Sequence, residues 1–411
     1  MTPPDPSPSQ FAPASEEELS RFLRENAAGE QQSISPVGGR TALQFLGSRQ
    51  PSGQLVSTSQ LNRVVDYPAR DMTITVESGV RISELAGILA KEGQQLPIDI
   101  THTHRATVGG AIACNVSGPR RFSHGTLRDY LIGVSAVAAD GRVFHAGGRV
   151  VKNVAGYDLC KLMTGSRGTL GVISQVTLKV KPLAESLEAI WVSCSTFQEI
   201  DRMVESLLNS ETRPVALEVL TPLAAEFIVA DSRVSFPIDK PVLLVFYEGS
   251  PEDIFWQVAR VRNELSHFSS DMMEEVGADL ARLLLATLRE FPDGGDVPLT
   301  FQANLPPSST LSFLEKCHSS GVSAVAHAGN GISTGHCSEE PGSPESLKRI
   351  LNDLTQYVHS HNGNLCLLQT DVDIRDNFNW WGLTGNSIPL MKKIKQQLDP
   401  HRLLNPHAMP F

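Results

Sequence analysis

The 411-residue chain carries 45 acidic and 35 basic side chains, which gives a formal net charge of −10 with histidine neutral. This charge excludes an ordinary nucleic-acid-binding domain, whose phosphate contacts need clustered lysine and arginine. The length exceeds that of one ordinary hydrophobic core, so we expect two domains, each able to fold without disulfides. The sequence has no signal peptide and no run of eighteen apolar residues. It therefore predicts a cytoplasmic protein whose only membrane contact is indirect, through partners on the inner face of a membrane.

The cysteines lack the C-x-x-C pairs and short spacings of zinc and iron–sulfur sites. We therefore expect reduced thiols and no iron–sulfur cluster on this chain. The six residues are Cys114, Cys160, Cys194, Cys317, Cys337 and Cys366.

The chain is expected to begin with a disordered tail, residues 1–14, that is rich in Pro and Ser. Ser15 and Glu18 then form the capping-box pattern of a helix whose apolar face starts at Leu19. The segment 33–47 reads S-I-S-P-V-G-G-R-T-A-L-Q-F-L-G. It suits either a tight loop that offers backbone N–H groups to a diphosphate or a plain turn between two strands.

From residue 61 to Pro182 the pattern predicts short strands and helices joined by glycine-rich turns. The expected elements are a strand at 72–76, a helix at 83–89 closed by Gly93, and a hairpin of strands 133–138 and 143–145 that turns at Asp140-Gly141. Glycine recurs here at 109, 110, 118, 125, 165, 168 and 171. Since a packed core would favour larger side chains, these glycines predict a backbone that lies close to a large, phosphate-bearing cofactor.

After Pro182 strand-like and helix-like runs alternate, which predicts a separate α+β domain with an antiparallel sheet. Strands are expected at 189–195, 215–220, 242–247, 299–303, 322–328 and 365–369. Helices are expected at 199–208, 253–268, 271–291, 311–319 and 345–361. A last helix at 388–398 leads into L-D-P-H-R-L-L-N-P-H, whose prolines predict an extended tail that returns to the first domain. The expected domains are therefore residues 15–184, residues 185–385 and a tail of residues 386–411.

Several motifs follow one another in a fixed order. They are G-G-R-T near residue 40, T-I-T-V-E-S-G at 73–79, A-T-V-G-G-A-I-A-C-N-V-S-G-P-R-R at 106–121, H-G-T-L-R-D-Y at 124–130 and G-S-R-G-T-L-G-V-I at 165–173. In this order they resemble the PCMH-type FAD-binding domain of the vanillyl-alcohol oxidase superfamily, and D-P-x-R-x-L-N-P resembles the carboxyl tail of that superfamily. V-K-N-V-A-G-Y-D-L at 151–159, with S-G-P-R-R, resembles more narrowly the GlcE-type FAD-binding subunit of glycolate oxidase.

The resemblance implies an α+β fold in which FAD lies between two subdomains of a PCMH-type domain, followed by an α+β cap domain with an antiparallel sheet. The implied diphosphate loop is Val37, Gly38, Gly39, Arg40 and Thr41. The implied second wrap is Gly109, Gly110, Ala113, Asn115, Gly118 and Gly125, together with Ser78, Gly79 and Thr107. The implied adenosine side is Gly168, Gly171, Val172 and Ile173. Some members attach the flavin through a histidine in the first loop, which this chain lacks, so non-covalent FAD is expected.

The larger catalytic subunits of such complexes carry H-x-G-D-G-N-x-H and E-H-G in the cap, whose side chains can hold a divalent metal. The matching stretch here is H-A-G-N-G-I-S-T, which keeps His327 but has Asn330 in place of the Asp and Thr334 in place of the second His, and His336 lies two residues late. Because a metal site needs several converging ligands, we expect no metal.

The catalytic residues are left open. His327, His102 and His104 are either acid–base groups beside a flavin or hydrogen-bonded structural histidines. Lys152 and Tyr157 in K-N-V-A-G-Y-D either face the flavin edge or a partner, or fix a loop.

The resemblance favours an FAD-binding subunit of a multi-subunit glycolate dehydrogenase, in which electrons pass from a 2-hydroxy acid through the flavin to an iron–sulfur partner and not primarily to oxygen. It implies a catalytic flavoprotein subunit and an iron–sulfur subunit as partners, and a small hydroxy acid as substrate. The first alternative is a self-sufficient FAD-dependent oxidase or dehydrogenase of a hydroxy acid or sugar alcohol. The second is a flavin-binding structural subunit without redox turnover. In each case the protein positions the flavin, and the flavin brings the redox chemistry.

Overall fold

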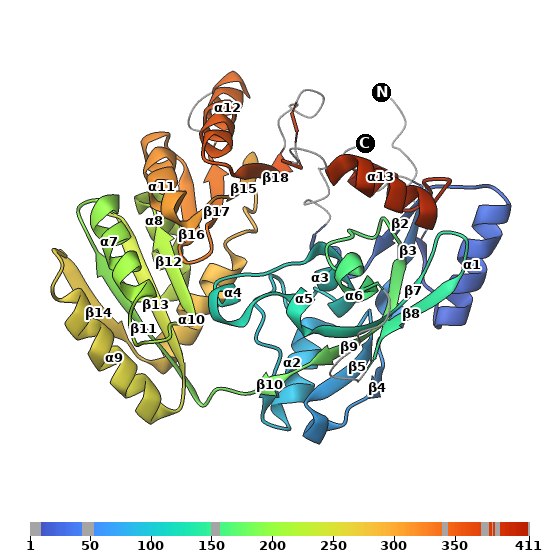
Figure 1. Cartoon of the computed structure of the whole chain (residues 1–411), viewed down its shortest axis with the longest axis horizontal. Helices are drawn as coiled ribbons and strands as arrows, with labels where there is room; N and C mark the ends of the chain where they lie inside the picture. Colours follow the sequence, from blue (N-terminus) through green and yellow to red (C-terminus); the bar gives the residue numbers. More distant parts are fainter. Residues whose placement is uncertain are drawn as a thin grey trace. The chain divides into compact units, whose positions relative to one another are not determined.

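The computed structural model describes residues 10–42, 53–148, 157–338, 344–370, 378–379, 381–382 and 387–409. The chain forms two compact units that alternate along the sequence (Figure 1). Unit 1 comprises residues 1–116, 126–183 and 384–411, and unit 2 comprises residues 117–125 and 184–383. The divisions after 183 and 383 lie next to the expected ones. The assignment of residues 117–125 to unit 2 differs from the expected boundaries, because this segment packs on the sheet of unit 2.

Unit 1 contains an antiparallel five-stranded sheet in the order β4-β5-β9-β7-β8 and a parallel three-stranded sheet in the order β1-β3-β2. Its strands are β1 (Gln10–Phe11), β2 (Ile34–Val37), β3 (Gln54–Ser57), β4 (Val64–Asp66), β5 (Thr73–Glu77), β6 (Gln94–Gln95), β7 (Leu131–Val137), β8 (Val143–Gly147), β9 (Val172–Lys179) and β10 (Lys181–Pro182). Its helices are α1 (Glu16–Ala28), α2 (Ile82–Ala90), α3 (Val108–Cys114), α5 (Leu127–Tyr130), α6 (Leu159–Met163) and α13 (Ser387–Leu398), with short 3₁₀ turns at Thr58–Gln60, Ala69–Asp71 and Pro406–Ala408.

Local sequence signals account for much of unit 1. The predicted cap of α1 is confirmed, since the Ser15 hydroxyl accepts a hydrogen bond from the Glu18 N–H at 3.2 Å. Leu19 and Leu23 of this helix are buried against β2 and β3. The hairpin of β7 and β8 is confirmed, and Gly141 at its turn has φ +80°.

The strand expected at 72–76 is β5, but it is buried along its whole length instead of on alternate residues. β5 lies in the interior of the sheet, between β4 and β9. Ile74 and Val76 join the apolar core. Of the polar side chains, Thr75 bonds to Thr177 at 3.0 Å and Glu77 pairs with Arg63, whereas the buried Thr73 hydroxyl has no hydrogen-bond partner among the described residues.

The disordered tail expected at residues 1–14 is wrong for Gln10 and Phe11. These residues form β1, which pairs in parallel with β3, and the Phe11 ring stacks on Phe22 with centroids 4.4 Å apart. Residues 1–9 lie outside the described residues. A long-range strand partner, which local composition does not reveal, orders this end of the chain.

Unit 2 is built on one eight-stranded antiparallel sheet in the order β14-β11-β13-β12-β16-β17-β15-β18. Its strands are β11 (Ser186–Ser193), β12 (Ala216–Leu220), β13 (Val242–Gly249), β14 (Met272–Val276), β15 (Leu299–Asn304), β16 (Ser323–His327), β17 (Ile332–Cys337) and β18 (Asn364–Thr370). Its helices are α4 (Arg121–His124), α7 (Phe197–Leu208), α8 (Pro222–Ser232), α9 (Pro251–Leu265), α10 (Ala278–Glu290), α11 (Thr310–Ser319) and α12 (Pro344–Ser360), with a 3₁₀ turn at Pro307–Ser309.

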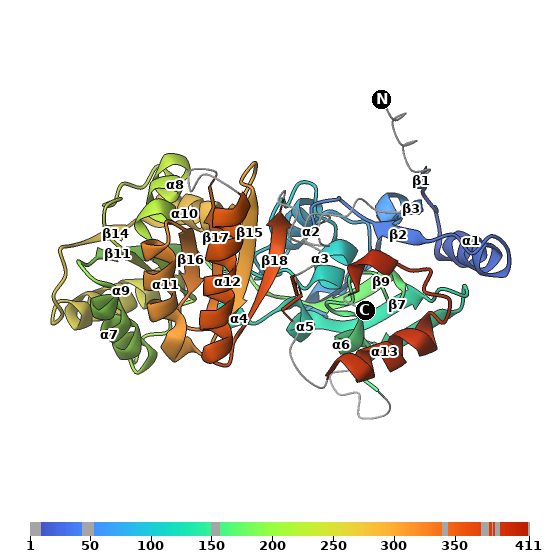
Figure 2. The same ribbon diagram turned by 90° about the horizontal axis from the view of Figure 1, so that it is seen from above.

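Helices cover both faces of this sheet (Figure 2). α7, α9, α11 and α12 pack on one face with the larger apolar core, and α8 and α10 pack on the other with a second core. The antiparallel sheet expected for the cap is therefore present, and each expected strand has a counterpart.

Three details of unit 2 differ from the sequence expectations. The helix expected at 271–291 is wrong in its first part, because Met272–Val276 pair with β11 as the edge strand β14 and the helix starts only after Gly277. The helix α8 and the strand β17 were not expected. α8 is short and apolar on most sides, and β17 follows the glycine-rich turn at 329–331, so neither shows clear periodicity.

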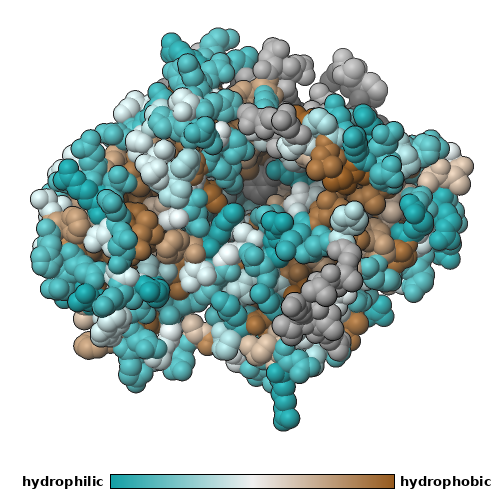
Figure 3. Space-filling model, viewed as in Figure 1, coloured by the Kyte–Doolittle hydropathy of each residue, from teal (hydrophilic) through white to brown (hydrophobic). Residues whose placement is uncertain are grey.

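In the described part of the chain, every helix is too short or too polar to cross a membrane. On the face drawn in Figure 3 hydrophilic residues predominate, and hydrophobic residues are scattered among them.

Candidate functional site

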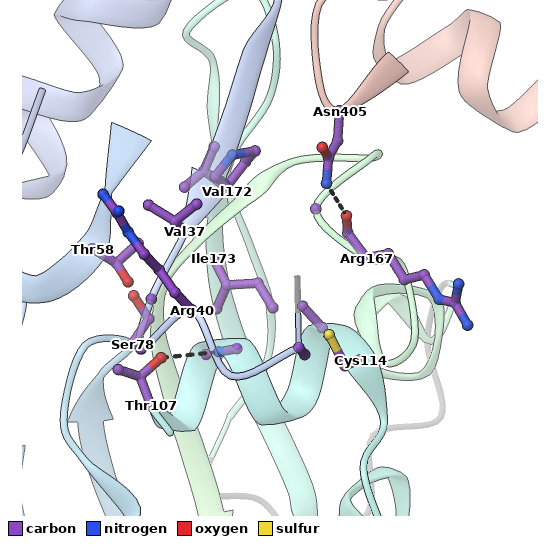
Figure 4. A pocket seen from close by; sticks show the side chains of 18 of the residues that line it. Val37, Arg40, Thr58, Ser78, Thr107, Cys114, Arg167, Val172, Ile173 and Asn405 are labelled. Carbon is purple, nitrogen blue, oxygen red and sulfur yellow. Dashed lines mark hydrogen bonds between the residues drawn. The ribbon is translucent and has the colours of Figure 1, made fainter. Parts of the chain in front are cut away.

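A groove in unit 1 brings together several of the glycine-rich segments (Figure 4). It holds about 700 Å³ of space that no atom fills, partly open to solvent, which is within the range of cofactor pockets. It is lined by Pro36, Val37, Gly38, Gly39, Arg40, Thr41, Ala42, Thr58, Ser78, Thr107, Gly109, Gly110, Ala113, Cys114, Arg167, Gly168, Gly171, Val172, Ile173 and Asn405.

The first wall is the loop that follows β2. A Cβ atom added at Gly39 would lie 1.8 Å from the carbonyl oxygen of Arg105, so only glycine lets this loop approach the segment before α3. Arg40 adopts φ +55°, and its guanidinium bonds to the Gln10 side chain of β1. The close approach and the left-handed residue fix the path of the loop along the groove.

The second wall is α3 and the residue that follows β5. The Thr107 hydroxyl caps α3 by accepting a hydrogen bond from the Gly110 N–H at 3.3 Å. A Cβ atom at Gly109 would lie 2.5 Å from the Ser78 Cβ, so this glycine allows α3 to pack against Ser78. The Ser78 side-chain oxygen is buried and has no hydrogen-bond partner among the described residues. Because buried hydroxyls are normally paired, this orphan fits a polar ligand in the groove.

The third wall is formed by residues 166–173 and by the carboxyl-terminal tail. Arg167 has φ +51° and Asn405 has φ +44°, and the Asn405 side-chain amide donates a hydrogen bond to the Arg167 carbonyl at 2.8 Å (Figure 4). With Arg40, three non-glycine residues of positive φ therefore line one groove. Such backbone strain is concentrated at binding sites, where the surrounding structure maintains it.

The groove is suited to a negatively charged ligand. Arg40 and Arg167 are the charged residues among those that line it, and no carboxylate is among them, although the whole chain carries a net charge of −10. The Cys114 thiol also lines the groove, and burial raises its pKa, so it is a neutral thiol at neutral pH. Two arginines, the unpaired Ser78 hydroxyl and the backbone of the loop after β2 together match the needs of a diphosphate.

Most of the residues predicted from the sequence lie in this groove. The exceptions are Gly79, Asn115, Gly118 and Gly125. Gly79 packs against the 3₁₀ turn at Thr58, and Asn115 ends α3 in the left-handed conformation beside Cys114. Gly118 and Gly125 belong to unit 2 and do not line the groove, because residues 117–125 pack on the other sheet.

Several residues that line the groove were not predicted from the sequence: Pro36, Ala42, Thr58, Cys114, Arg167 and Asn405. All but Thr58 stand in or beside the motifs that indicated the cofactor, and Asn405 is the asparagine of L-N-P. Thr58 lies in V-S-T-S-Q, which carries no signal of a binding site.

Unit 2 places His327 beside a buried carboxylate. The His327 Nδ1 atom lies 2.8 and 2.7 Å from the two oxygens of Glu218, whose side chain is fully buried. Because the carboxylate accepts, Nδ1 carries the proton. In the neutral ring the lone pair is therefore on Nε2. No described residue forms a hydrogen bond with Nε2. The His327 side chain is 12% exposed. A carboxylate that holds an imidazole in this tautomer is an arrangement able to accept a proton.

A second charged group of unit 2 fixes the segment 117–125. Glu248 of β13 accepts from His124 at 2.5 Å and from Arg120 at 3.3 Å, and all three side chains are largely buried. Burial by itself would raise the pKa of Glu248, but the hydrogen bond from His124 and the charge of Arg120 outweigh it and hold the pKa below its ordinary value. The Phe122 ring of the same segment lies directly against Gly329.

The other candidates are not gathered at the groove. His336 is buried, with Nδ1 3.0 Å from the Thr300 hydroxyl and Nε2 2.7 Å from the Phe291 carbonyl, so both ring nitrogens are engaged. Burial lowers its pKa to about 4. Tyr157 is 96% exposed, and Lys152 lies outside the described residues. His102 and His104 lie in a turn before α3 and do not line the groove.

Metal ligands do not converge in the part of the chain that the structure describes: no group of three His, Cys, Asp or Glu side chains there could hold an ion. All six cysteines are free in the structure.

Comparison with protein families identifies the domain that contains the groove. Residues 9–147 match the family model described as an FAD binding domain, and residues 382–409 match the C-terminal domain of FAD linked oxidases. The chain carries an FAD-binding domain. Its cofactor is FAD, and the two matched stretches contribute the loop after β2, α3 and the tail residue Asn405 to the groove.

Relatives of this FAD-binding protein include flavoproteins named for hydroxy acids. Glycolate oxidase subunit GlcD of Bacillus subtilis is 24% identical over 97% of this chain and 88% of that protein. D-2-hydroxyglutarate dehydrogenase of Xanthomonas citri pv. viticola is 26% identical over 98% of this chain and 89% of that protein. Glycolate oxidase subunit GlcE of Escherichia coli is 37% identical, but over 147 residues that make up 36% of this chain and 42% of that protein.

A solved structure has a similar fold. A solved structure of alkyldihydroxyacetonephosphate synthase superposes with a TM-score of 0.66 at 18% identity, covering 96% of this chain and 76% of that one. The expected PCMH-type FAD-binding fold, with an α+β cap and an antiparallel sheet, is confirmed.

Proposed function

We propose that this chain is an FAD-dependent 2-hydroxy-acid dehydrogenase subunit that acts on glycolate as part of a multi-subunit complex. The observation that carries the proposal is the carboxylate-free, glycine-lined groove within an FAD-binding domain whose whole-chain relatives are named for glycolate and D-2-hydroxyglutarate. When bound, FAD would supply a hydride acceptor, which takes one proton and two electrons from the C–OH carbon of the substrate and leaves glyoxylate.

The protein itself would hold the cofactor and accept the proton of the substrate hydroxyl. In the groove the 37–42 loop would bind the diphosphate, with Ser78 and Thr107 as hydroxyl partners. Oxidation of an alcohol also releases the hydroxyl proton. His327, oriented by Glu218, is our candidate acceptor because its Nε2 lone pair is available.

The subunit role rests on the relatives and on the cysteines. The names of GlcD and GlcE describe subunits of glycolate oxidase, and the scattered free cysteines of this chain provide no iron–sulfur relay. We therefore propose a catalytic flavoprotein subunit and an iron–sulfur subunit as partners. A self-sufficient hydroxy-acid dehydrogenase is the second candidate, and it is favoured by the similarity to GlcD over 97% of this chain, against 36% for GlcE.

Anaerobic reduction tests the activity. Purified holoprotein would be mixed with glycolate, D-lactate or D-2-hydroxyglutarate, and the visible flavin bands would be followed. Rapid bleaching by the isolated chain supports the self-sufficient enzyme. Bleaching only after a co-purified flavoprotein and iron–sulfur protein are present supports the subunit. An FAD-loaded complex that no hydroxy acid reduces would contradict both and leave a structural flavoprotein.

The His327→Gln variant tests the proton acceptor, with His359→Gln on the exposed face of α12 as its control. We expect His327→Gln to retain FAD and to slow reduction at least tenfold, because a positioned base contributes about 10²–10⁴-fold. Reduction at the wild-type rate would exclude this role.

We further propose that the FAD is non-covalent, since the described residues lining the groove include no histidine and Cys114 is a neutral thiol. Acid precipitation should release the yellow colour into the supernatant, and flavin that stays with the pellet would contradict it.

A further inference from the structure

The carboxyl-terminal tail is a structural part of unit 1. Leu404 bridges to Ile34 of β2 in a parallel register, the Ile34 N–H donates to the Leu403 carbonyl at 2.7 Å, and the Asn405 N–H donates to the Ile34 carbonyl at 2.7 Å. The tail thus continues the three-stranded sheet beyond β2. Asn405, the next residue, lines the groove.

A buried ion pair lies beneath this tail. The ammonium of Lys395 on α13 is 2.6 Å from an Asp399 oxygen, and the two side chains are 5% and 0% exposed. The Asp399 oxygens also accept the N–H groups of Leu403 and Leu404 at 2.9 and 2.8 Å. Asp399 therefore closes the turn that redirects the chain from α13 into the tail.

The remaining hydrogen bonds of Lys395 join the tail to the groove wall. Its ammonium donates to the Leu404 carbonyl at 2.8 Å and to the Thr169 carbonyl at 2.7 Å. Thr169 stands between Gly168 and Gly171, which line the groove. One buried cation thereby links the two segments of the third groove wall, which lie more than two hundred residues apart in the sequence.

Each hydrogen of this ammonium has an oxygen partner, so the pair avoids the penalty of an unsatisfied buried charge. Loss of the lysine would leave the Asp399 carboxylate buried with two backbone donors and no cation. The turn, and with it the tail, would then be easier to detach.

We propose that Lys395 and Asp399 are a positioning pair that couples docking of the tail to binding of FAD, because only the docked tail places Asn405 and the 166–171 loop around the groove. The proposal rests on the assignment of the groove to FAD and is independent of the substrate. By linkage, FAD must stabilise the docked tail by the same factor by which the docked tail strengthens FAD binding.

The test measures FAD affinity and tail docking separately. Wild type, Lys395→Met and the control Lys393→Met, which alters an exposed lysine of the same helix, would be freed of flavin and titrated with FAD while flavin fluorescence is recorded. Trypsin cleavage after Arg402, an exposed residue next to the buried Leu403, would report the undocked tail with and without FAD.

We expect FAD to slow cleavage after Arg402 in the wild type and in Lys393→Met. We expect Lys395→Met to weaken FAD binding by about 5- to 150-fold, the usual range of such couplings, and to speed cleavage of the apoprotein. Wild-type affinity in Lys395→Met together with rapid cleavage would overturn the proposal, since docking and binding would then be independent.

A second variant decides the matter where Lys395→Met does not fold, as judged by circular dichroism. Asn405→Ala removes the side-chain bond to Arg167 and leaves the ion pair intact. We expect weaker FAD binding, wild-type cleavage of the apoprotein and reduced protection by FAD; unchanged affinity and protection would overturn the proposal. Wild-type protein that binds no FAD would instead overturn the assignment of the groove.

Discussion

At the residue scale, two glycines of the groove, Gly39 and Gly109, are needed because they lack a Cβ atom and not because of their backbone conformation. Gly39 and Gly109 have no positive φ, but each lies where a Cβ atom would collide, with Arg105 and with Ser78. The sequence indicated that these positions needed glycine. It did not identify the neighbour that excludes a side chain, because the neighbour comes from another segment of the chain.

The Gly109→Ala variant tests this steric argument. We expect it to lose about 1–3 kcal/mol of stability and most of its FAD, because overpacking pushes α3 away from Ser78. Flavin content from the visible spectrum and the urea midpoint would measure both effects. Gly87→Ala in α2 is the control, since its Cβ meets nothing within 4 Å; full flavin retention in Gly109→Ala would contradict the argument.

Substitutions at Gly110 can test the charge of the ligand separately from the steric effect of a side chain. A Cβ atom here meets only the Thr107 hydroxyl, at 3.1 Å, so a side chain fits with a small adjustment. Gly110→Glu should bind FAD at least tenfold more weakly than Gly110→Gln, because the two differ in charge and hardly in size. Equal FAD dissociation constants in a fluorescence titration would mean that the diphosphate does not lie near Gly110.

His336 gives a prediction for acid stability. Its pKa is about 4 in the folded protein because of burial, against an ordinary value near 6.5. Between these values the unfolded chain binds more protons, so stability falls as the pH drops from 6.5 to 4, by up to about 3 kcal/mol. In His336→Gln, the free energy of unfolding of unit 2 should depend less on pH between 4 and 6.5. The exposed His359→Gln should leave the slope unchanged, and an unaltered slope in His336→Gln would contradict the assignment.

At the element scale, short elements depended on partners that local sequence does not show. Met272–Val276 has the composition of a helix start, yet it pairs with β11 at the sheet edge, and Gln10–Phe11 has the composition of a loose tail, yet it pairs with β3. Elements with their own signals, such as the capped α1 and the hairpin of β7 and β8, were predictable. In these two short segments, pairing with a distant strand outweighed the local preference of the sequence for helix or coil.

Lys395 illustrates the same limit within one helix. Its spacing from Asp399 is that of an ordinary exposed i, i+4 pair, which is worth a few tenths of a kcal/mol. The structure buries both side chains and gives the lysine two further carbonyl partners. Burial of the pair depends on the tail folding back over α13, so the sequence pattern alone could not distinguish it from a surface pair.

The segment 117–125 is the element whose placement was least expected, and its anchor can be tested. Glu248→Gln removes the carboxylate shared by Arg120 and His124. We expect unit 2 to lose about 3 kcal/mol, since breaking a buried ion pair is strongly destabilising. Because the folded pKa of Glu248 is depressed, this stability is present above its unfolded pKa and is lost as the pH falls through the folded value.

Urea unfolding at pH 7 and at pH 4 would measure the loss for Glu248→Gln, with the exposed Glu252→Gln on α9 as control. The difference between Glu248→Gln and wild type should shrink at the lower pH. A constant difference would show that the ion pair does not set the stability of this segment.

At the scale of the whole molecule, the order of motifs predicted the cofactor and the fold class, because several glycine-rich segments must meet at one ligand. Their meeting point was less predictable. The groove draws on residues 36–42, 58, 78, 107–114, 167–173 and 405, all from unit 1, whereas two of the predicted glycines, Gly118 and Gly125, fold with unit 2. The order of the motifs indicated that they belong to one FAD-binding domain. The structure was needed to show in which unit each motif lies.

This division predicts how FAD changes the unfolding of the whole protein. With FAD at 100 times its dissociation constant, the unit that binds it gains about 2.7 kcal/mol, and the lining residues place that gain in unit 1. Differential scanning calorimetry of apoprotein and holoprotein should show one transition that rises with FAD concentration. The transition that Glu248→Gln lowers, which marks unit 2, should keep its midpoint. A shift of both transitions by FAD would instead show that unit 2 also binds the flavin, and would restore Gly118 and Gly125 as candidate contacts.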